Sequence, residues 1–312
     1  MAEHKTDPLA PTEIFKHVED ATYFHVPRKL APASHGHIEI PQPFEGREPL
    51  FVAHTGNPVA DRIIQPLDLK ITKFMVIELA VAILMCLFFI ALAKSIRGGR
   101  LPRGRFGNML EAMLLFFRDN IARPYIGGHD ADRFVPFLWT LFFFLLGCNL
   151  FGMIPWMGTP TSALATTATL AFITFIVVIG AGMKKLGPAG FWKAQVPHLD
   201  LSLEIGGINF EPVLKIFLIP MIFAIEVLGL IIKHCVLAVR LLANMMAGHV
   251  VLAVILAFIA ASAQSLMWWA VMPASVFGAT ALSMLELFVA FLHAYIFTFL
   301  AALFIGMAVH PH

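Results

Sequence analysis

The chain has 312 residues, of which 59% are hydrophobic and 13% are charged, and its mean hydropathy is +0.80. A chain with so few polar residues cannot cover the surface of a soluble globular protein, so a soluble globular fold is excluded. The net charge of +2 is small and gives no indication of nucleic-acid binding. Composition therefore predicts a polytopic membrane protein, in which the loops that hold the lysines and arginines set the orientation.

Residues 1–70 are polar and broken by prolines, and they are interpreted as an extramembrane segment. A short helix is expected from Thr12 to His17, and His37-Ile-Glu-Ile-Pro alternates like a brief strand. The segment contains six histidines, but their spacing fits no metal-ligand pattern, so no metal site is predicted. These histidines are His4, His17, His25, His35, His37 and His54.

Residues 71–312 are predicted to form the membrane domain, and three of its apolar runs are long enough to cross the bilayer once each. The runs cover residues 74–93, 134–153 and 162–183. Basic residues follow the first run between Lys94 and Arg105, and others follow the third run at Lys184 and Lys185. The positive-inside rule places both loops in the cytoplasm or the mitochondrial matrix, which puts the N-terminus outside. The amphipathic stretch 106–121 is predicted to lie on the inner membrane surface.

The last two apolar runs, 212–261 and 272–309, are longer than a perpendicular crossing needs. As one helix the first of them would reach about 75 Å, more than twice the hydrocarbon thickness of roughly 30 Å. It is either a tight hairpin of two spans or one strongly tilted helix. Because no strong turn signal interrupts its middle, we favour the tilted helix. The fold predicted is all-α, with five transmembrane helices and one surface helix.

Arg240 lies in the middle of the first long run, where an arginine costs roughly 3 kcal/mol to insert. Apolar sequence continues for several turns on both sides, so the side chain cannot snorkel to the interface. At about 100° per residue, a polar stripe forms on one helix face, and His249 points about 180° away from Arg240. The stripe contains Lys215, Glu226, Lys233, Arg240 and Asn244.

An arginine keeps its proton at physiological pH, so Arg240 is interpreted as a fixed positive barrier. A carboxylate on a moving partner would have to release its proton before passing that charge. On the last run, Glu286 and His293 are seven residues apart and share a face. They suit a proton relay, since histidine titrates near neutral pH. The alternative is a packing pair, hydrogen-bonded to the backbone or to each other.

The sequence resembles subunit a of the rotary F-type ATP synthases over roughly residues 72–309. The resemblance is carried by Arg240-Leu-Leu-Ala-Asn-Met-Met-Ala-Gly-His249, Glu226-Val-Leu-Gly-Leu-Ile-Ile-Lys233 and Leu285-Glu-Leu-Phe-Val-Ala-Phe-Leu-His-Ala-Tyr-Ile-Phe297. Asn149-Leu-Phe-Gly-Met-Ile-Pro155 and Thr167-Ala-Thr-Leu-Ala171 are similar to the family as well. The resemblance implies five crossings and a surface helix, with the last two helices steeply tilted along a ring of c subunits.

The resemblance also implies a role for each polar residue. Arg240 would face the c-ring carboxylates and separate two aqueous half-channels, with Asn244 beside it. The outer path would be lined by Asn149, His249 and Glu286, and Glu226 would lie toward the inner path. The sequence departs from the family pattern at three positions. His293 stands where glutamine is usual and would add a third protonatable group or replace the amide's hydrogen bond, His234 stands where proline is common, and Gly152 replaces an acidic residue of some members.

The partners implied are the c-ring, subunit b of the peripheral stalk, the remaining ATP synthase subunits and lipid, in a bacterial inner membrane with a cytoplasmic C-terminus. No cofactor is expected, and no catalytic site, because the chain has no phosphate-binding glycine loop. One alternative is a haem-binding subunit of cytochrome b type, with His234, His249 and His293 as candidate axial ligands. A proton-coupled secondary transporter is the other, although the sequence has no internal repeat.

Overall fold

The structure is a computed structural model that describes residues 20–25, 37–43, 70–96, 105–154, 157–196, 204–205, 208–209 and 211–310. Within these residues five helices are long and apolar enough to cross a membrane. They are α3 (Lys73–Ile96), α6 (Gly128–Gly152), α7 (Leu164–Leu186), α9 (Glu211–Ala261) and α10 (Trp268–Val309). The prediction of an all-α polytopic membrane protein is therefore confirmed.

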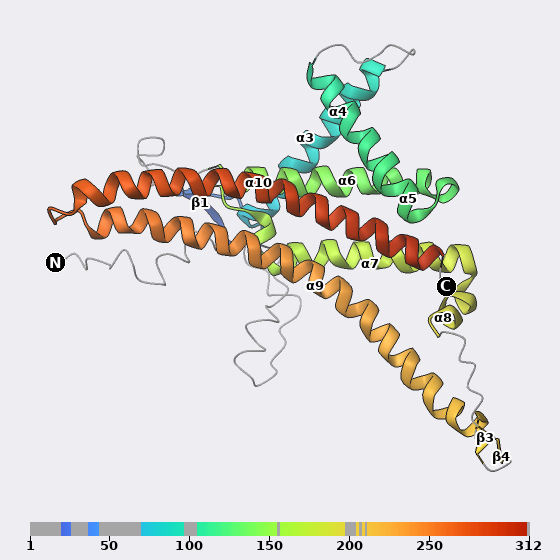
Figure 1. Ribbon diagram of the computed structural model, residues 1–312. Coiled ribbons are helices and arrows are strands. Elements are labelled where there is room, and N and C mark those ends of the chain that lie inside the picture. The colour runs from blue at the N-terminus through green and yellow to red at the C-terminus, as the bar shows by residue number, and fades with distance from the viewer. Residues whose placement is uncertain are drawn as a thin grey trace.

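α9 is one continuous helix of 51 residues, and Pro220 inside it does not divide it. The choice between a hairpin and a single long helix is thus decided in favour of the single helix. α9 and α10 run side by side from the turn that joins them, and the N-terminal part of α9 then leaves the other helices (Figure 1). Ile216 and Phe217 in this part expose 77% and 74% of their surface. Their exposure in an apolar helix fits a lipid or protein environment.

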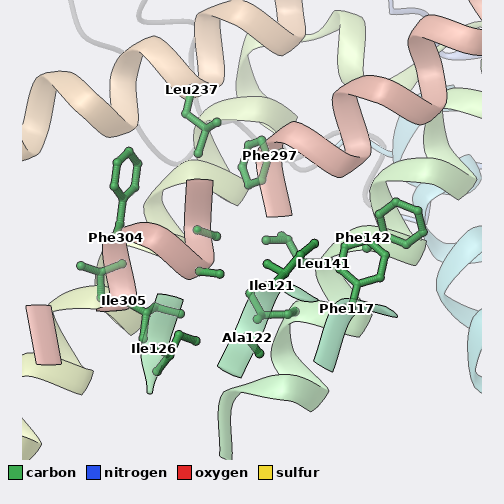
Figure 2. Close-up of a cluster of buried hydrophobic side chains, with 14 of the residues drawn as sticks. Phe117, Ile121, Ala122, Ile126, Leu141, Phe142, Leu237, Phe297, Phe304 and Ile305 are labelled. Carbon is green, nitrogen blue, oxygen red and sulfur yellow. The ribbon is translucent and has the colours of Figure 1, made fainter. Parts of the chain in front are cut away.

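The core lies where α10 packs against α5 (Arg123–Ile126), α6, α7 and the middle of α9. α10 contributes the small buried residues Ala290, Ala294, Ala301 and Ala302, which let neighbouring backbones approach closely. Larger side chains fill the remaining space, as Figure 2 shows. The residues of this buried cluster that are labelled there are Phe117, Ile121, Ala122, Ile126, Leu141, Phe142, Leu237, Phe297, Phe304 and Ile305.

The expected surface helix is present as α4 (Arg105–Phe116), which continues through a π-helical segment, η1 (Phe117–Ala122), into α5 (Arg123–Ile126). α4 leads away from α6 and α10 on the side to which α3 also extends, whereas η1 and α5 pack on α6 and α10 (Figure 1). The indole Nε1 of Trp139 on α6 donates to the Leu114 carbonyl at 3.1 Å, which attaches α4 to the core. The location of α4 on the membrane surface stays a prediction.

Two helices begin earlier than the apolar runs suggested. α6 begins at Gly128 rather than at residue 134, and α10 at Trp268 rather than at residue 272. The polar residues before the apolar run of α6 join the helix because its hydrogen bonds need no apolar side chains. Among these residues, Asp130 accepts a 2.6 Å hydrogen bond from Lys185 at the end of α7. The two helices are thereby joined at the end where the sequence places the cytoplasm.

The extramembrane segment contributes a small antiparallel pair, β1 (Tyr23–His25) with β2 (His37–Glu39). The brief strand expected at His37 is thus confirmed, and the helix expected from Thr12 to His17 lies outside the described residues. Gln42 fixes the segment to the start of α3 through two hydrogen bonds with the Ile71 backbone, at 2.8 and 2.9 Å. Elsewhere, a short helix, α8 (Pro188–Ala194), follows α7, and β3 (Glu204–Ile205) pairs with β4 (Ile208–Asn209) before α9.

Candidate functional site

Arg240 lies on the outward face of α9. Leu237, Ala238 and Leu241 beside it are buried against the other helices, whereas Arg240 itself is exposed. Within the described part of the chain Arg240 forms no ion pair, although it lies close enough to His293 on α10 for their charges to interact. The charge is therefore directed away from the core, toward whatever covers this face.

The other members of the predicted stripe follow the same face. Glu226 and Lys233 are exposed and Asn244, one turn after Arg240, is half-buried. The side chain of Lys215 lies outside the described residues. This arrangement follows from helical periodicity, because seven residues return the chain almost to the same side of the helix.

His249 faces the opposite side of α9 and is held in the protein. Its Nε2 atom shares a short hydrogen bond with the Thr159 hydroxyl, which comes from the turn between α6 and α7. Arg240 and His249 thus contact different surroundings, as their spacing of nine residues indicated.

Glu286, on α10, lies close to the part of α9 that contains His249. Its carboxyl group packs against Gly248, where an added Cβ would lie only 2.5 Å from Oε1. Oε1 is buried and has no hydrogen-bond partner among the described residues. Gly248 adjoins His249, so the fold brings the acid and the imidazole of the predicted outer path into one neighbourhood.

Asn149 is almost completely buried near the end of α6, at 1% exposure. Its Oδ1 accepts a 2.7 Å hydrogen bond from the Thr161 hydroxyl, and its Nδ2 donates to the Ala290 carbonyl at 3.2 Å. Ala290 follows Glu286 by one turn of α10. The amide is therefore fixed between the α6–α7 turn and the helix that carries the glutamate.

Three polar contacts were missed by the sequence reasoning. Thr161 lies in the short 3₁₀ turn η2 (Pro160–Ser162), and Thr159 directly precedes this turn. The Thr159 hydroxyl contacts His249, and the Thr161 hydroxyl contacts Asn149. Glu78, the single charge of the first apolar run, accepts a 2.7 Å hydrogen bond from Thr166 on α7. A carboxyl group inside a span was the available signal for Glu78, whereas threonines in a loop carry no such signal.

His234 has a different environment from the other two candidate haem ligands. It is buried between the rings of Phe175 and Phe304, and its Nδ1 lies 2.9 Å from the Leu230 carbonyl. No contact among the described residues joins His234 to His249 or His293. The structure therefore does not bring His234 together with either of the other two proposed axial ligands.

Comparisons with known proteins agree with the arrangement of these helices. A family described as ATP synthase A chain matches residues 74–306, from the first of the five long helices to the last. ATP synthase subunit a of Myxococcus xanthus is 41% identical over 249 residues, which cover 79% of this chain and 76% of the relative. The corresponding protein of Chloroherpeton thalassium is 38% identical, over 78% of this chain and 67% of its own.

A third relative, ATP synthase subunit a of an Anaeromyxobacter species, is 37% identical over 282 residues. The match covers 88% of this chain and 64% of that relative, so the chain spans between 64% and 76% of the length of these three proteins. The family match extends over most of the described membrane helices, including α6, α9 and α10, which carry the polar site. The chain therefore belongs to the ATP synthase A chain family.

Proposed function

We propose that the chain is the proton-translocating stator subunit of an F-type ATP synthase. It provides two aqueous half-channels to and from the c-ring carboxylates, and Arg240 is the barrier that couples proton flow to rotor rotation. The observation that carries this proposal is the exposed Arg240 within the apolar span Ile216–Ala261, which forms no ion pair with any residue that the structure describes. A charge in such a span is expensive unless it meets an opposite charge.

The c-ring supplies that opposite charge in this proposal. Arg240 cannot relay protons, because its guanidinium group stays charged at physiological pH. A carboxylate beside it is favoured in its ionised form and must have released its proton before it arrives. The exposed face of α9 is therefore assigned to the rotor, and the arginine prevents a direct leak between the two half-channels.

The outer half-channel is assigned to Asn149, His249 and Glu286, which gather where α6, the turn η2, α9 and α10 come together. Glu226 is assigned to the inner half-channel, with Asn244 beside the arginine. His293, near Arg240, is proposed as an additional protonatable group. The separation of Arg240 and His249 onto opposite faces of α9 supports two distinct proton paths. A single continuous path would need both residues on the same face of the helix.

ATP chemistry takes place on partner subunits in this proposal. One proton crossing 100 mV releases about 2.3 kcal/mol, so a rotor must add the contributions of several protons for each ATP. The partners proposed are the c-ring, subunit b of the peripheral stalk and the remaining synthase subunits, in a bacterial inner membrane with the N-terminus outside.

The test is Arg240→Ala in the intact complex, reconstituted in vesicles with an imposed proton gradient. We expect ATP synthesis to be abolished while the c-ring still copurifies with the chain. Arg118→Ala serves as the control, because among the described residues this exposed arginine pairs only with the neighbouring Asp119, and surface pairs contribute little. Normal synthesis by the Arg240→Ala complex would refute the proposal, and a haem absorbance in the purified chain would favour a cytochrome b-type subunit instead.

A further inference from the structure

The turn between α6 and α7 is built into the protein interior. Connecting segments usually lie on the surface because their backbone polar groups need water, yet Thr159 and Thr161 expose only 1% and 0% of their surface. The turn satisfies its own backbone: the amide and the hydroxyl of Ser162 both donate to the Thr159 carbonyl, at 3.0 and 2.7 Å. Pro160 restricts the backbone between the two threonines. The turn is therefore a rigid support.

The two threonine hydroxyls extend from this support to different helices. Thr161 donates to Asn149 on α6, and Thr159 bonds to His249 on α9. A hydroxyl group both donates and accepts, so it can hold an imidazole nitrogen with or without a proton on that nitrogen. One short turn thus fixes the orientation of two side chains assigned to the same path.

Gly152 at the end of α6 leaves the space that Thr159 occupies. A Cβ at position 152 would overlap the Thr159 side chain and would lie 2.8 Å from its Cα atom. A larger residue at 152 would therefore displace Thr159 as a whole, backbone included. The glycine found here, in place of the acidic residue of some family members, has a structural reason in the position of Thr159.

We propose that Thr159 is a positioning residue for His249, and that Gly152 is required to admit it. With Nε2 held by the hydroxyl, the ring cannot turn freely, and Nδ1 becomes the nitrogen that exchanges protons with the outer path. In imidazoles, the bond made by one nitrogen sets the role of the other. This inference rests on the proposed function, because it assigns a role within the same half-channel.

The test compares Thr159→Val, which keeps the branched shape and removes the hydroxyl, with Thr159→Ser, which keeps the hydroxyl. Proton-driven ATP synthesis is measured in the intact complex, together with the amount of chain and c-ring in the membrane. We expect Thr159→Val to lose roughly 5- to 100-fold in rate, the range that follows from leaving a buried polar group without its partner. Thr159→Ser is expected to keep most of the wild-type rate. The control is Thr174→Val, because within the described part of the chain that buried hydroxyl bonds only to the Leu170 carbonyl of its own helix.

A second variant reaches the same contact without removing any polar group. Gly152→Ala displaces Thr159 and is expected to lower the rate to a similar degree, whereas Gly180→Ala, where an added Cβ meets nothing within 4 Å, is expected to have no effect. Wild-type synthesis by Thr159→Val or Gly152→Ala overturns the inference. It is also overturned if Thr159→Ser is as slow as Thr159→Val, or if the valine variant fails to accumulate while the serine variant does.

Arg240→Ala, measured in the same series, separates this inference from the proposed function. If Arg240→Ala is inactive and Thr159→Val is normal, only the role of Thr159 is refuted. If Arg240→Ala synthesises ATP normally, the proposed function fails first.

Discussion

Gly248→Ala tests whether the close approach of α9 to Glu286 matters for proton transfer. The added Cβ would lie 2.5 Å from Oε1 of Glu286, whereas ordinary contacts begin at 3.4 Å, so the carboxyl group must retreat by about 0.9 Å. A displacement of about 1 Å in a reacting group can cost roughly 10²-fold in rate. The colliding atom is the end of a flexible side chain, and alanine is about 1 kcal/mol better than glycine in a helix. We therefore expect a large loss of activity with little change in stability.

The assay is proton-driven ATP synthesis by the reconstituted complex, with thermal denaturation as the measure of stability. Gly229→Ala is the matched control, because it lies on the same helix and its added Cβ meets nothing within 4 Å. Combining Gly248→Ala with Glu286→Asp, which shortens the side chain by one methylene, is expected to restore part of the rate lost in the single variant. Unchanged synthesis in Gly248→Ala would refute the reasoning that the position of this carboxyl group limits proton transfer.

Two further predictions concern the core and the pair of titratable groups. Gly306→Ala would place a Cβ against the backbone carbonyl of Tyr125, which cannot move as a side chain can. We expect a loss of about 1–3 kcal/mol in stability, seen as a lower denaturation temperature, and Gly278→Ala on the same helix should show none because its surroundings are open. Exchanging the two groups in the double variant His249→Glu with Glu286→His is expected to retain more ATP synthesis than either single change. Equal loss in all three would contradict a shared path.

The contacts of the polar site depended on the tertiary structure. Asn149 was recognised from the sequence as a buried amide, but its bonds to Thr161 and to the Ala290 carbonyl join residues 12 and 141 positions away. By hydropathy alone, Thr159 does not differ from the other small polar residues near the start of the third span. Its contact with His249 exists only because α9 packs against the turn η2 between α6 and α7.

The sequence by itself determined the five spans and the opposite directions of Arg240 and His249, and it favoured the continuity of α9. These properties follow from local rules, the length needed to cross a bilayer and the 3.6-residue period of the helix. Tertiary packing alone decided that Gly152 admits Thr159 and that Gly248 admits Glu286. Close approach between helices depends on which side chains meet, and that information is spread over residues far apart in the chain.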